Sequence, residues 1–175
     1  MKNMIPILSA AILMLSSCSQ ATRTAENTST ATDSVTTAAV EPSAAKPLFA
    51  TMKIKDVTNT GDSVKLKFTV YNTADSIQHF CKWHTPFEPL MSKYLDVKAA
   101  NGEEAAYKGA MAKRIMPPPA DSYIAVNPGD SLSVDVDLLK GYAITKPGKY
   151  NISYVGQNMS GIVVKDSVAF VYGKP

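Results

Sequence analysis

The chain has 175 residues, of which 45% are apolar and 19% are charged, with a formal net charge of +3. This length fits one globular domain with processing segments and excludes two full domains. The two cysteines cannot build a disulfide framework. The 18 Lys and Arg residues are spread along the chain and form no run, which argues against a nucleic-acid partner.

The N-terminal segment has the features of an export signal. A positive charge precedes an apolar stretch, Met4 to Leu15, that is too short to cross a bilayer as a helix. The stretch ends in Leu15-Ser16-Ser17-Cys18, which resembles a bacterial lipobox. The resemblance implies that residues 1–17 are removed and that a lipidated Cys18 anchors the protein in a membrane. Ser19, where a retention signal would place Asp, favours the outer membrane, facing the periplasm. A plain secretory signal with a chance Cys is the alternative.

Residues 18–47 form the lipidated Cys and a tether that we expect to be disordered. Thr, Ala and Ser fill most positions after Cys18, and such a composition cannot bury enough apolar surface to offset the entropy of ordering. Ser34 lies in one of five Asp-Ser-apolar triplets, a pattern that some Gram-negative bacteria O-glycosylate in exported proteins. Ser34 is therefore a candidate glycosylation site. The other four triplets lie between a turn and a strand, where Asp and Ser bond the turn backbone.

The remaining residues, 48–175, alternate between apolar and polar side chains as half-buried β-strands do. The alternation is clearest over residues 64–71, 132–137, 150–154 and 168–172, and weaker strands are expected over 51–58, 77–83, 94–99 and 122–126. Turn sequences separate the strands, among them Asn101-Gly102, a strong hairpin signal. The pattern predicts one all-β domain, an antiparallel immunoglobulin-like β-sandwich of seven to eight strands.

The only two His residues, His79 and His84, lie on either side of Cys81. No H-E-x-x-H, G-x-S-x-G or P-loop motif occurs, so we expect neither an enzyme nor a cofactor. Cys81, His84 and Met91 have part of the spacing of a blue-copper site, and His79 could supply a second imidazole. A copper or zinc site at these four residues is the alternative function. The other interpretation is that Cys81 is a buried free thiol that packs as a small apolar residue.

Two segments have the composition of a protein-binding surface. The first, Lys82 to Glu88, contains the only Trp of the chain. An exposed Trp beside charged residues is typical of an interface hot spot, whereas a buried Trp83 would belong to the core. The second is Lys113-Arg114, followed by an Ile-Met-Pro-Pro-Pro run that stiffens the chain. The candidate partner-binding residues are Lys82, Trp83, His84, Thr85, Pro86, Phe87, Glu88, Lys113 and Arg114.

An ordered series of motifs between residues 55 and 172 carries a family resemblance. It consists of Asn72-Thr73, Lys82–Glu88, Tyr107-Lys108-Gly109, Lys113-Arg114, Asn127–Ser131, Val136–Leu138, Gly141-Tyr142 and Pro147–Tyr150. The series resembles the N-terminal β-sandwich region of deuterolysin-type (aspzincin) metalloendopeptidases, especially bacterial ones that cleave at peptidyl-lysine. In that family a catalytic module with H-E-x-x-H and a further Asp ligand follows this region, whereas this chain stops at Pro175. The resemblance therefore implies an accessory domain, which would shield a protease or help it to fold, and no catalytic residue.

Together these features predict a non-catalytic, lipid-anchored β-sandwich of the bacterial cell envelope. Its partners would be a membrane, through the lipid anchor, and another protein, such as a protease that it inhibits or helps to fold. A periplasmic metal-binding protein is the competing function.

Overall fold

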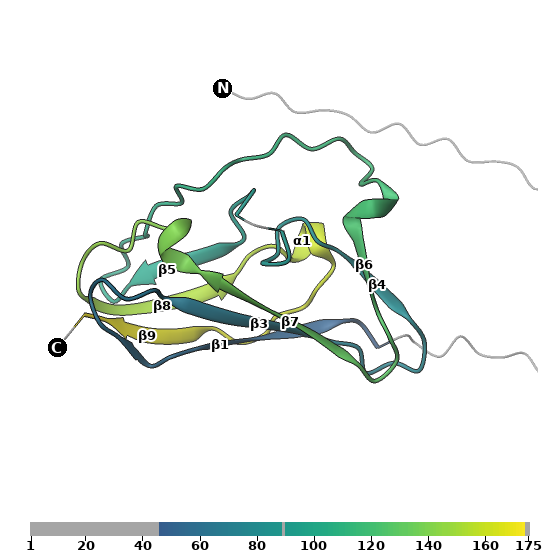
Figure 1. Ribbon diagram of the computed structural model, residues 1–175, viewed down its shortest axis with the longest axis horizontal. Coiled ribbons are helices and arrows are strands. Elements are labelled where there is room, and N and C mark those ends of the chain that lie inside the picture. Colours follow the sequence, from purple (N-terminus) through teal and green to yellow (C-terminus); the bar gives the residue numbers. More distant parts are fainter. Residues whose placement is uncertain (1–45, 89, 174–175) are drawn as a thin grey trace, which may run out of the picture. The chain divides into compact units, whose positions relative to one another are not determined.

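The computed structural model describes residues 46–88 and 90–173; the lipobox, Cys18, the tether and Ser34 lie outside this part. The described residues form a three-stranded, a four-stranded and a two-stranded sheet (Figure 1). The strands are β1 (Phe49–Ile54), β2 (Val57–Thr58), β3 (Lys65–Tyr71), β4 (Gln78–Cys81), β5 (Leu95–Ala99), β6 (Tyr123–Val126), β7 (Ser131–Asp137), β8 (Gly148–Tyr154) and β9 (Val168–Tyr172). Two short 3-10 turns, η1 (Ala120–Ser122) and η2 (Leu138–Lys140), and one helix, α1 (Gln157–Ser160), complete the described elements. Within this part of the chain, no helix has the length and apolar character needed to cross a membrane.

Every segment in which alternation predicts a strand contains one. The predicted segment 51–58 divides into β1 and β2, so the described residues hold nine strands rather than seven or eight. One pairing also departs from the antiparallel prediction, because β2 runs parallel to β9, with Val57 opposite Val171. A strand of two residues has no alternation to read, which is why the sequence could not reveal it.

The core lies between the three-stranded sheet, in the order β1-β3-β7, and the four-stranded sheet, in the order β2-β9-β8-β5. In β3 the apolar residues at every second position are buried and the lysines between them are exposed. Each buried side chain of this size stabilises the fold by about 1.5–3 kcal/mol. The buried residues of the two sheets include Met52, Leu66, Phe68, Val70, Leu95, Val97, Tyr150, Ile152, Phe170 and Tyr172.

The β4–β6 pair extends the β3–β7 pair, and the side chain of Asn72 joins the two. Asn72 is buried, and its backbone N–H donates to Asp130 O over 3.0 Å, just beyond the end of β3. Its amide nitrogen donates to Ser76 O (2.8 Å) and to Val126 O (2.9 Å), and its side-chain oxygen accepts from the N–H of Ala74. These bonds satisfy backbone groups where the chain leaves one sheet for the next.

A long strap, residues 106–119, leads from the hairpin after β5 to η1 and β6, and Figure 1 shows it crossing the domain in one pass. Three backbone hydrogen bonds fix its first half: Ala143 N–H to Ala106 O (2.9 Å), Lys108 N–H to Gly141 O (2.8 Å) and Ala112 N–H to Met91 O (2.8 Å). Residues 113–118 make no backbone–backbone hydrogen bond within the described chain. Side chains must therefore hold this second half in place.

Candidate functional site

The side chain of Arg114 anchors the second half of the strap. Its guanidinium donates two hydrogen bonds to the Glu88 carboxylate, Nη1 to Oε1 over 3.0 Å and Nη2 to Oε2. The guanidinium carbon also lies 4.6 Å from the centre of the Trp83 ring, a cation–π contact. The side chains of Arg114 and Glu88 are 16% and 12% exposed, so the ion pair is largely removed from water. The two segments that the sequence marked separately thus meet in one anchor.

The segment from Lys82 to Glu88 is folded into a compact turn around Thr85. The Thr85 hydroxyl donates to Lys82 O over 2.6 Å and accepts from the N–H of Phe87 over 3.1 Å. The N–H of Glu88 donates to Thr85 O over 3.1 Å, and His84 has a left-handed backbone with φ of 57°. This turn fixes the backbone of Glu88, from which its carboxylate reaches the Arg114 guanidinium.

Most of the partner-binding candidates in this segment point inward. Trp83 is 6% exposed, and Thr85 and Pro86 are buried. The Phe87 ring packs edge-on against Phe80, with 5.2 Å between ring centres. The interpretation of Trp83 as an exposed hot spot is therefore wrong: the indole is covered, and Arg114 lies over it.

Of the other candidates, Lys82 and His84 are half-buried, and the ammonium group of Lys82 donates to Asp121 O over 2.9 Å. Lys113 is the one member of the candidate set, all of which the structure describes, that is exposed. Lys113 is thus open to solvent, whereas Arg114 and Glu88 pair with each other.

The four residues of the metal alternative differ in their surroundings. His79 is exposed on β4, Cys81 is 2% exposed and free, and Met91 is 38% exposed. Across residues 46–88 and 90–173, no three His, Cys, Asp or Glu side chains gather closely enough to hold a metal ion. The geometry therefore offers no support for the copper or zinc site, and Cys81 has the surroundings of a buried thiol.

The strap displays large apolar side chains that the folded core does not use. Met111 is 72% exposed, Ile115 82% and Met116 62%. We call Met111, Lys113, Ile115 and Met116 the strap surface. Several large apolar side chains exposed on one short segment are typical of a binding surface. Sequence reasoning singled out the run after Arg114 but not Met111, because an irregular segment has no periodicity that would tell inward from outward side chains.

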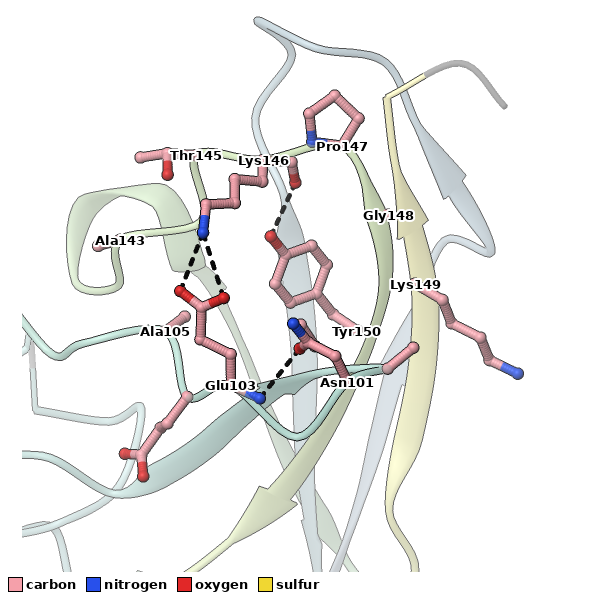
Figure 2. Close-up of a pocket in the computed structure, with 13 residues that line it drawn as sticks. Asn101, Glu103, Ala105, Ala143, Thr145, Lys146, Pro147, Gly148, Lys149 and Tyr150 are labelled. Carbon is pink, nitrogen blue, oxygen red and sulfur yellow. Dashed lines mark hydrogen bonds and ion pairs between the residues drawn. The ribbon is translucent and has the colours of Figure 1, made fainter.

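A pocket of about 270 Å³ lies at the other end of the strap's path, between the hairpin after β5 and the start of β8 (Figure 2). The ammonium group of Lys146 lies 3.1 Å from the Glu103 carboxylate, and both side chains are more than half exposed. The Tyr150 hydroxyl donates to Lys146 O over 2.7 Å, while Lys149 points away from the pocket in Figure 2. None of the lining residues, all of them described, is a His, Cys or Ser. Its polar side chains are those of Asn, Glu, Thr, Lys and Tyr residues.

His84 lies in the same turn as Glu88, and its surroundings shift its pKa. Burial lowers the pKa of His84 below its ordinary value of 6.5, the Arg114 cation lowers it further, and Glu88 partly opposes both. The backbone carbonyl of His84 accepts a hydrogen bond from the Tyr154 hydroxyl over 3.0 Å. Burial raises the pKa of Tyr154 to about 12, so this donor keeps its proton at neutral pH. His84 is therefore neutral beside the anchor.

The lowered pKa of His84 predicts that the domain loses stability in mild acid. The unfolded chain takes up a proton near pH 6.5 and the folded chain only at lower pH, so protonation favours unfolding as the pH falls below about 6.5. Urea unfolding between about pH 5 and 7.5 should give a free energy of unfolding that decreases toward pH 5. His84→Asn should flatten this slope, since Asn tolerates a left-handed backbone. His79→Asn, at an exposed position, is the control and should keep it; an unchanged slope in His84→Asn would contradict the prediction.

The described residues thus form an all-β sandwich domain, and the strap crosses its surface. Residues 51–166 match the family model of the immunoglobulin-like domain, so the chain belongs to the immunoglobulin-like domain family. The predicted fold class is thereby confirmed.

Among characterised proteins, the chain is 29% identical over 102 residues to a protein named "Extracellular protease" from Aeromonas hydrophila. The match covers 57% of this chain and 28% of that protein, so the chain spans little more than a quarter of its relative. This is a weak similarity to an extracellular protease. A solved structure of a mutant β-glucosidase from Listeria innocua, in complex with laminaribiose, aligns with 73% of this chain and 16% of its own at 11% identity. Its TM-score of 0.37 is too low to carry any argument.

Proposed function

We propose that this chain is a non-catalytic binding domain of the bacterial cell envelope that recognises a protease through the strap surface. A lipidated Cys18 would hold it in the outer membrane, facing the periplasm, and residues 19–47 would let the domain reach its partner. The domain would act as an inhibitor or a folding helper.

The exposure of Met111, Ile115 and Met116 is the observation that carries this proposal. Leaving three large apolar side chains in water brings the isolated domain no stability, whereas covering them by a partner would contribute to binding. The buried Arg114–Glu88 pair supports the same conclusion, because a segment that is already held in place loses little conformational entropy when it binds.

The weak similarity to an extracellular protease supports both the location and the class of partner. The matched relative is named for an activity outside the cytoplasm, and the lipobox of this chain leads to the same side of the membrane. The resemblance of the motif series to the region before a deuterolysin-type catalytic module also supports a protease as the partner.

Capture of the partner tests the proposal. The full-length chain, purified from membranes in detergent, is exposed to envelope and culture-medium proteins of the source bacterium, and bound proteins are identified by mass spectrometry. We expect a protease, and we expect Ile115→Asp combined with Met116→Asp to weaken its binding about tenfold or more, since charges replace central apolar contacts.

Ile77→Asp is the matched control, because Ile77 is 55% exposed but lies between β3 and β4, outside the strap. This variant should capture the protease as the unaltered chain does. Equal capture by the strap variant, or a bound set that contains no protease, would overturn the proposal.

A further inference from the structure

Lys113 lies between two residues, Ala112 and Arg114, that are each bound to another part of the domain. On one side, the backbone N–H of Ala112 donates to Met91 O over 2.8 Å. On the other, Arg114 is tied down by Glu88 and by the face of Trp83. Lys113 itself is exposed. The chain thus presents one cationic side chain to solvent from a short segment fixed at both ends.

The backbone around Lys113 is also open to pairing. Endopeptidases bind a substrate by adding it as an extra strand, through backbone hydrogen bonds, while a pocket takes one side chain. Residues 113–116 make no backbone–backbone hydrogen bond within the described part of the chain, so no other described segment competes for their N–H and C=O groups. The strap's other lysine differs, because the N–H of Lys108 already donates to Gly141 O. Met111 and Ile115 flank Lys113 with apolar surface that would pack beside the pocket.

We propose that Lys113 enters the acidic specificity pocket of an endopeptidase that cleaves after lysine, and that the strap inhibits this enzyme as a tightly held substrate mimic. This inference rests on the proposed function, to which it adds the class of protease and the residue that the protease would bind in its pocket. A carboxylate at the base of such a pocket pairs with the Lys113 ammonium group, which selects a basic side chain over an apolar one.

The contacts that hold Ala112 and Arg114, on either side of Lys113, explain why binding would lead to inhibition rather than digestion. Hydrolysis of the Lys113–Arg114 bond consumes one water and leaves a carboxylate on Lys113 and an amino group on Arg114. Glu88 and Trp83 still hold Arg114, and Met91 still holds Ala112, so the new ends stay side by side. The reverse step, which joins them and releases the water, then competes with departure of the product.

The experiment measures inhibition of two probe enzymes, trypsin and a lysine-specific endopeptidase, by the full-length chain, with a small chromogenic substrate. We expect inhibition of both, and we expect Lys113→Ala to raise both inhibition constants about 100-fold, as the loss of a central charged contact does. Lys113→Arg should still inhibit trypsin, which accepts either base, but should lose the lysine-specific enzyme. Lys108→Ala is the matched control and should inhibit both enzymes like the unaltered chain.

Three results would overturn the inference: no inhibition of either probe enzyme, inhibition that Lys113→Ala leaves unchanged, or cleavage after Lys113 as fast as after a lysine in the urea-unfolded chain. The capture experiment separates this failure from that of the proposed function. If the strap surface still captures a protease in a way that depends on Ile115 and Met116, the binding surface stands and only the assignment of Lys113 is wrong.

Discussion

Replacing Glu88 with Ala is expected to lower the free energy of unfolding by about 3 kcal/mol, because the change leaves the Arg114 guanidinium buried without a counter-charge. Breaking one partner of a buried ion pair typically costs about 3–5 kcal/mol, and the lower end applies here since both side chains keep slight contact with water. The Nε atom of Arg114 is already buried without a hydrogen-bond partner in the described structure, so the loss of Glu88 adds further unpaired donors to the same guanidinium. Urea unfolding measures the loss.

The same substitution should free the second half of the strap. Residues 113–118 have no backbone–backbone hydrogen bond within the described chain, so Arg114 is the group that holds them. Limited digestion by a protease of broad specificity should cut between residues 111 and 118 at least about tenfold faster in Glu88→Ala than in the unaltered chain, as expected for local opening that is easier by 1.4 kcal/mol or more.

The surface ion pair Lys146–Glu103 provides the matched control for Glu88→Ala. Its side chains are 71% and 56% exposed, and water screens such a pair so strongly that it adds little to the stability. Glu103→Ala should therefore leave both the stability and the digestion pattern nearly unchanged. In a double-mutant cycle, Glu88→Ala combined with Arg114→Ala should cost less than the two single changes added together. Additive losses, or a Glu88→Ala variant as stable as Glu103→Ala, would show that Arg114 is not the anchor.

The strands could be predicted from sequence because the physical signal is local. In β3, the alternation of Leu66, Phe68 and Val70 with lysines records directly which side chains face the core. The parallel pairing of β2 with β9 could not be predicted, since two residues, Val57 and Thr58, contain no period. The hairpin signal at Asn101-Gly102 predicts a turn, and the hydrogen bond from the N–H of Gly102 to Ala99 O, 2.9 Å long, confirms it.

The candidate site was predicted only in part because its central contact is not local. Glu88 and Arg114 are 26 positions apart and belong to two irregular segments, so no spacing rule relates them. Sequence reasoning marked both segments but could not tell that their charged groups face one another. The sequence therefore leaves open whether Trp83 is a contact or a core residue, and it gives no sign of Met111, which is 72% exposed. Only the three-dimensional structure, in which the two segments meet, shows which residues anchor the strap and which are exposed on it.

Replacing Trp83 with Ala is the second change with a large expected effect, a loss of about 3–5 kcal/mol in the free energy of unfolding. Trp83 is 6% exposed, and removal of a buried aromatic side chain leaves a cavity that the surroundings fill incompletely. The variant also removes the aromatic face beneath Arg114, 4.6 Å from its guanidinium carbon. Trp83→Phe should lose clearly less, because a smaller ring still fills part of the space and still faces the cation.

Tyr123→Ala is the control for Trp83→Ala, since it deletes an aromatic side chain that is 43% exposed on β6, and it should change the stability by less than about 1 kcal/mol. Urea unfolding and the capture of the protease are measured on the same preparations. We expect Trp83→Ala to lose stability and, through the loosened strap, part of its binding. If Trp83→Ala kept full stability and lost only the protease, Trp83 would be a contact residue after all, and its burial beneath Arg114 would open when the partner binds.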